Sequence, residues 1–206
     1  MPLEGTEFSY RLRTHHVVSR LNPCHEDNYW IGNAALSWGG SADEGFELLG
    51  RAVQCRFWDE LPPFLYGFNQ QFFRRDAKLA RQAIELAAER STENAAGFRN
   101  IAIMLTVNAT KDAHMALSML RLERDGARDP KLREMLDKRV IRIEGLVSLR
   151  EAQKSYEERL GKKLERPDQL LKEGILVSFP DDPLRLGFQF RDGEFHLRQA
   201  KILGLN

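Results

Sequence analysis

A short stretch near the N-terminus gathers the side chains with the most chemical potential. Its members are His15, His16, Cys24, His25, Glu26 and Asp27. Imidazole, thiolate and carboxylate groups are the donors that transition-metal sites use, so this stretch would suit a metal-binding protein. The alternative is structural: Asp27 or Asn28 caps a helix, and the histidines lie on a partly exposed N-terminal helix. We predict the structural role and keep the metal-binding protein as an alternative.

Other signatures of catalysis are missing from the sequence. It contains no phosphate-binding glycine loop, dinucleotide fingerprint, nucleophile elbow or zinc-binding helix motif. The carboxylates of Asp181, Asp182 and Asp192 belong to the sequences Asp181-Asp182-Pro183 and Asp192-Gly193, where turn formation explains them without a bound cation. We therefore predict a protein that is not an enzyme and that has no cofactor.

Composition and charge limit the partners. The chain has 206 residues, 42% of them hydrophobic and 30% charged, which allows a real core in one domain or in a domain with an appendage. Its net charge is only +1, so no global field would recruit nucleic acid or anionic lipid. No apolar stretch is long enough to span a membrane, and the first residues lack the apolar core of a secretion signal. We expect a soluble chain, periplasmic or envelope-associated if an N-terminal anchor was removed.

The elements that would position these residues repeat along the chain. The segment from Trp30 aligns with the segment from Leu65 at a constant offset: Gly32 and Gly67 are 35 positions apart, as are Ala52 and Ala87. A weaker third copy begins at Asn100. Each copy has apolar residues three to four positions apart on either side of a short polar break, which predicts helix, turn, helix. A period of this length built from paired helices is typical of an α-solenoid.

The repeats resemble tetratricopeptide repeats (TPRs), a family whose 34-residue unit has a small residue in its first helix and Ala, a large residue and Ala in its second. Gly or Ala at those places lets two helices cross closely. The matching residues here are Gly32, Gly45, Leu49 and Ala52 in the first copy and Gly67, Ala80, Ile84 and Ala87 in the second. The usual closing proline is absent after Ala52 and Ala87, so the repeats are divergent, and the resemblance covers about residues 22–124.

The resemblance implies a partner-binding groove lined by the first helix of each pair. The positions are Tyr29, Asn33, Phe64, Phe68, Gln71, Arg99, Ile103 and Thr106. This lining is rich in aromatic and amide groups, which favours an apolar peptide or helix and argues against a basic clamp for an acidic chain end. The alternative for each aromatic residue is burial in the core, where aromatic residues at helical spacing usually lie.

Cys24 and Cys55 are the only cysteines, placed before the first helix of the first pair and at the end of its second. In an antiparallel pair these ends lie on the same side, so the sulfurs could form a disulfide in an oxidising compartment or stay as two free thiols.

After Pro130 the pattern changes. Residues 131–161 predict one long helix, or two that meet near Gly145, acting as a cap on the last repeat. Pro167 and Gly174 bound a short helix, and alternation around Asp192 and Gly193 predicts a β-hairpin. The order of these features resembles the tail of certain bacterial TPR proteins and, more distantly, the soluble end of pseudopilins.

The sequence thus predicts a mainly α protein, a TPR-like α-solenoid with a helical cap and a small C-terminal β-hairpin. Its parts would be an N-terminal helix (1–21), the repeats (22–129), the cap (130–163) and a tail with a short helix and the hairpin (164–206). We expect a non-enzymatic scaffold or adaptor in a bacterial assembly, with a cell-envelope setting suggested by the tail. The alternatives are a structural subunit of a larger complex and the metal-binding protein.

Overall fold

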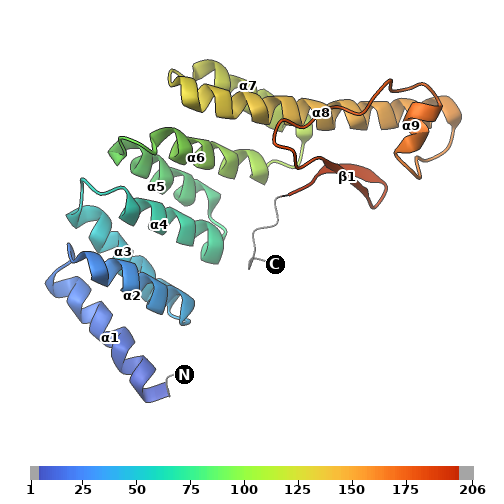
Figure 1. The fold of residues 1–206 in the computed structure, drawn as a ribbon. Helices are drawn as coiled ribbons and strands as arrows, with labels where there is room; N and C mark the ends of the chain where they lie inside the picture. The colour runs from blue at the N-terminus through green and yellow to red at the C-terminus, as the bar shows by residue number, and fades with distance from the viewer. Residues whose placement is uncertain (1–4, 200–206) are drawn as a thin grey trace. The chain divides into compact units, whose positions relative to one another are not determined.

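The computed structural model describes residues 5–199, without the side chains of residues 5–9, 11 and 12. Residues 1–4 and 200–206, which belong to the predicted N-terminal helix and tail, lie outside the described residues. The described chain is mainly helical, with one small antiparallel sheet of two strands near its C-terminal end (Figure 1). It divides into two compact units at Ala109 and Thr110, and each is described by itself.

Unit 1 consists of successive helices joined by short turns. Its elements are α1 (Gly5–Leu21), α2 (Glu26–Trp38), α3 (Ala42–Cys55), α4 (Leu61–Asn69), the π-helical turn η1 (Gln70–Arg74), α5 (Ala77–Arg90) and α6 (Ala95–Ala109). Neighbouring helices from α2 to α6 pack on one another. Short turns at residues 39–41 and 75–76 separate α2 from α3 and η1 from α5, and Arg75 adopts a left-handed φ of 55°. The helical hairpins predicted from the spacing therefore form.

Small residues lie where these helices cross. A Cβ added at Gly67 of α4 would be 2.7 Å from Ile84 Cγ1 and 2.9 Å from the carbonyl oxygen of Ala80, both in α5. A Cβ at Gly32 of α2 would be 2.8 Å from Leu48 Cδ1 of α3. Real Cβ atoms essentially never approach that closely. Glycine at the shared position of the two copies thus sets the distance between paired helices.

The first pair closes over an apolar cluster. Its fully or almost fully buried members are Tyr29, Leu36, Leu48, Leu49 and Ala52, and Leu61, Leu65 and Tyr66 of α4 pack against it. The cluster joins α2, α3 and α4, so burial of apolar surface holds consecutive helices together.

Unit 2 is built on one long helix. Its elements are α7 (Ala113–Gly126), α8 (Pro130–Leu160), α9 (Asp168–Lys172), β1 (Phe188–Arg191) and β2 (Glu194–Leu197). The short helix and the hairpin appear where the sequence predicts them, and Asp192 and Gly193 both have the positive φ that a two-residue hairpin turn needs. α7, α9 and β2 all pack against α8.

Helix α8 runs through Gly145 without a break, which decides between the one-helix and two-helix predictions. A Cβ at Gly145 would be 2.7 Å from the ring of Phe188 and 3.3 Å from Pro180. Gly145 therefore makes room for the segment that leads into β1. Among residues 5–199, no helix is both long and apolar enough to cross a bilayer.

Candidate functional site

The histidine and cysteine stretch is used for structure. Cys24 is bonded to Cys55 as a disulfide, which takes its thiolate away from any metal. His25 is the N-cap of α2 and accepts a hydrogen bond from the N–H of Asn28, so the predicted caps, Asp27 or Asn28, were wrong. His15 Nδ1 lies 2.9 Å from Asn28 Oδ1. Within the described part of the chain, no three His, Cys, Asp or Glu residues are grouped so as to hold a metal ion.

The disulfide lies beside a polar cluster centred on Arg56. The guanidinium pairs with Asp59 at 2.7 Å, donates to the carbonyl of Cys24 and lies over the rings of Tyr29 and Trp58. Burial works to raise the pKa of Asp59, but hydrogen bonds from the Leu61 N–H, Arg56 and Tyr29 outweigh it and hold that pKa below its usual value. Burial also raises the pKa of the Tyr29 hydroxyl, which donates to Asp59. This cluster fixes the loop between α3 and α4.

Two of the predicted groove residues on α2 are buried. Tyr29 is 2% exposed, and its hydroxyl donates a hydrogen bond to the carboxylate of Asp59. Asn33 is 6% exposed and its Oδ1 accepts from Ser37 and from Asn69 of α4. Both side chains therefore join α2 to its neighbours and present little surface to a partner.

The other predicted groove residues divide between core and surface. Phe64 is half-buried with its ring 5.1 Å from that of Phe98, and Ile103 is buried. Thr106 accepts a hydrogen bond from Arg81. The exposed members are Phe68 and Arg99, and the Oε1 of Gln71 is buried without a hydrogen-bond partner.

A different face of α2 carries exposed aromatic groups, as does the loop after α3, where Phe57 is 71% and Trp58 is 56% exposed. Trp30 and Trp38 are each 54% exposed, and Ile31 is 53% exposed. Ile31 and Trp38 are seven positions apart, about two helical turns, so they lie along one face, and Trp30 adjoins that face next to Ile31. The Trp38 ring lies 4.7 Å from that of Phe72 in η1, which stacks on Phe68. We call these residues the aromatic surface: Trp30, Ile31, Trp38, Phe68 and Phe72.

One end of the aromatic surface is hollowed and acidic. A hollow of about 280 Å³ is lined by Glu26, Asp27, Tyr29, Trp30 and Leu61. Glu26 pairs with Arg56 at 3.2 Å across an exposed contact. A basic side chain of a partner could contact both a carboxylate and the face of an indole ring here.

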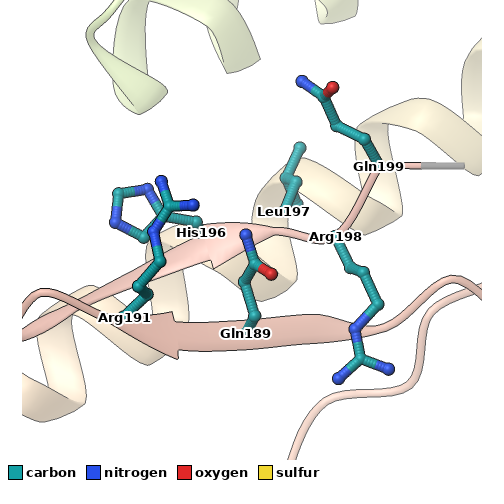
Figure 2. Close-up of a pocket in the computed structure, with 6 residues that line it drawn as sticks. All are labelled: Gln189, Arg191, His196, Leu197, Arg198 and Gln199. Atoms are coloured by element: carbon teal, nitrogen blue, oxygen red, sulfur yellow. The ribbon is translucent and has the colours of Figure 1, made fainter. Parts of the chain in front are cut away.

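Unit 2 has a second, polar surface on the hairpin. The hollow of about 660 Å³ in Figure 2 is lined by Gln189, Arg191, His196, Leu197, Arg198 and Gln199. Gln189 and His196 face each other across the strands, and their side chains stand on the same side of the hairpin as that of Arg191 (Figure 2). In the view of Figure 2, the Arg198 side chain points away from that of Gln189. The lining contains no carboxylate.

A buried ion pair holds the segment before the hairpin on α8. Arg142 and Asp182 meet at 2.9 Å with side chains 7% and 3% exposed. Burial works to raise the pKa of Asp182, but the N–H groups of Leu184 and Gly187 and the charge of Arg142 keep it below its usual value. Arg142 also donates to the carbonyl of Arg198. Turn chemistry at Asp182 was predicted, whereas its partner 40 residues away was not.

The fold is thus that of a mainly helical protein with helix pairs in one unit and a long helix with a hairpin in the other. Comparison of the chain with protein-family models, curated proteins and solved structures finds no match.

Proposed function

We propose that this chain is a non-enzymatic scaffold, a TPR-like α-solenoid that holds an apolar peptide or helix of a partner protein in a bacterial multi-protein assembly. The aromatic surface carries the proposal. Two tryptophans on one helix face, each 54% exposed, retain apolar area that folding alone would bury.

The paired helices support the repeat assignment. Gly32 and Gly67 occupy the same position in two copies 35 residues apart, and both make room for a large side chain of the following helix. That is the role of the small residue in a TPR unit, as the resemblance implies. The third copy, from Asn100, rests on the sequence alone.

The shape of the aromatic surface favours an elongated apolar occupant. Trp30, Ile31 and Trp38 lie on α2, and Phe68 of α4 and Phe72 of η1 extend the surface. A partner helix with apolar residues every three to four positions would cover such a stripe.

The disulfide supports a setting outside the reducing cytosol. Disulfides persist in oxidising compartments such as the bacterial periplasm. Together with the resemblance of the tail, Cys24–Cys55 favours a cell-envelope assembly.

A quantitative pull-down tests the proposal. The intact chain is compared with a variant carrying Trp30→Ser and Phe68→Ser and with the control Leu122→Ser, which removes a side chain 76% exposed in unit 2. Circular dichroism checks that all three fold. We expect one partner that the intact chain and the control capture and the double variant loses. Equal capture by all three, or capture only of further copies of this chain, would reject the proposal.

A further inference from the structure

The two edges of the hairpin differ in whether another part of the chain packs against their outward main-chain groups. Arg198 N–H donates to Gly187 O at 3.2 Å, so the next pair, Phe188 and Leu197, is a non-hydrogen-bonded pair. Residues of such pairs direct their N–H and C=O groups away from the partner strand. The outward groups of β1 are therefore those of Phe188 and Phe190.

β2 packs against α8, whose side chains bond one carbonyl of β2 and one of the turn. Arg150 Nε donates to the carbonyl of Phe195 at 3.1 Å, and Gln153 Nε2 donates to that of Gly193 at 2.7 Å. No such contact is made at β1: within residues 5–199, the outward main-chain groups of Phe188 and Phe190 have no hydrogen-bond partner. An uncovered strand edge is a template for another strand.

The two faces of the hairpin differ in chemistry. On the inner face, Phe188 fills the space beside Gly145, and the Phe190 ring lies 5.0 Å from that of Phe195, which is 2% exposed. On the outer face, Gln189, Arg191 and His196 offer hydrogen-bond donors around the hollow in Figure 2.

The outer face carries charges of both signs, but the lining of its hollow contains two arginines, Arg191 and Arg198, and no carboxylate. Arg191 pairs with Asp192 at 3.1 Å, but both side chains are largely exposed, so the pair is weak. Glu194 is opposite Arg191 in the register and does not line the hollow.

We propose that the open edge of β1 receives an extended segment of a partner protein in which apolar and acidic residues alternate. Main-chain hydrogen bonds to Phe188 and Phe190 would supply strand addition. Side chains alternate between the faces of a strand, so apolar residues would continue the phenylalanine face and acidic ones the Arg191 face. This site is separate from the aromatic surface and does not depend on the proposed function.

The test uses the full chain and a short synthetic peptide that alternates valine and glutamate, with a valine and lysine peptide as its control. Amide hydrogen exchange at Phe188 and Phe190 is measured by NMR. We expect the glutamate peptide at saturation to slow exchange at both amides about fivefold or more, as new main-chain hydrogen bonds would, and the lysine peptide to have little effect.

Charge reversal sharpens the test. Arg191→Glu, at a side chain 68% exposed, should reverse the preference between the two peptides, whereas Lys154→Glu, at one 77% exposed on α8, should not. Unchanged exchange at Phe188 and Phe190 with either peptide would overturn the proposal. Protection that grows with protein concentration alone would also overturn it, because the occupant would then be a second copy of the chain. So would an NMR shift of His196 caused by inorganic phosphate, if the glutamate peptide leaves the amides of Phe188 and Phe190 unprotected.

Discussion

The two units combine close packing and polar contacts in different ways. In unit 1, glycines and large apolar side chains fit together between helices that are close in sequence, as at Gly67 and Ile84. In unit 2, polar side chains of α8 bond main-chain and carboxylate groups 40 to 56 residues away, as Arg142 does. Unit 1 also has polar contacts, such as that of Tyr29 with Asp59, and unit 2 also has a close contact at Gly145, but the ion pair of Arg142 and Asp182 is more deeply buried than that of Arg56 and Asp59. The difference predicts which substitutions harm which unit.

The largest effect is expected from Asp182→Ala. It removes one partner of a buried ion pair and the acceptor of three main-chain N–H groups, so about 3–5 kcal/mol of local stability should be lost. Hydrogen exchange measured by mass spectrometry should be faster in residues 180–199 and unchanged in unit 1. The neighbouring Asp181→Ala, at an exposed position, is the control. Equal effects of both substitutions would mean that the buried pair does not hold the segment.

Removing the disulfide comes next and affects the other unit. Cys24 and Cys55 are 31 positions apart, and replacing both with serine should lower the stability of unit 1 by about 2–4 kcal/mol. Denaturation monitored by tryptophan fluorescence measures this, because all three tryptophans lie in unit 1. Reducing agent should destabilise the intact chain and leave the variant unchanged. An intact chain indifferent to reductant would contradict a stabilising disulfide.

A matched pair of glycine substitutions tests packing by shape. Gly67→Ala forces a Cβ against Ile84 and the Ala80 carbonyl and should cost about 1–3 kcal/mol. Gly97 in α6 has no heavy atom within 4 Å of an added Cβ, so Gly97→Ala should be neutral or stabilise by up to about 1 kcal/mol. Thermal unfolding of both variants gives the comparison, and similar costs would show that the crossing at Gly67 is not close.

The smallest expected effect is a loss of local stability around Asp182 at acid pH. The pKa of Asp182 in the folded chain lies below its usual value of about 3.9, so its contribution to stability is fully present above that value. As pH falls through the lowered pKa, the carboxylate takes a proton and the contribution is lost. Exchange in residues 180–199 should therefore quicken below about pH 4. Asp182→Asn should remove that acid step, and an unchanged step would assign it to another group.

Features encoded locally could be predicted from the sequence. The hairpin follows from Asp192 and Gly193, which readily adopt positive φ, and the helix breaks from turn residues such as Gly39 and Gly40. The cap of α2 was mispredicted because His25, an uncommon N-cap, accepts the bond expected of Asp27 or Asn28.

Features that depend on distant partners could not be predicted. From the sequence, Gly145 could end a helix, and only the structure shows that it makes room for Phe188. The pairing of Asp182 with Arg142 joins residues 40 positions apart and follows no sequence periodicity. The α2 groove positions were assigned through the family resemblance, but the Asp59 carboxylate and the Asn69 amide draw Tyr29 and Asn33 inward. Trp30 and Trp38 occupy the exposed face instead, and the exposure of an aromatic residue cannot be told from helical spacing alone.

Site-specific photo-crosslinking tests the central claim, that the aromatic surface binds a partner protein. A photoreactive phenylalanine analogue replaces Ile31, 53% exposed beside Trp30, or Leu122 of unit 2 as the control, in cells of the native host. We predict one discrete partner crosslinked from position 31, absent from position 122 and lost when Trp30 is also changed to serine. Crosslinks of equal pattern from both positions, or only to copies of this chain, would contradict the claim.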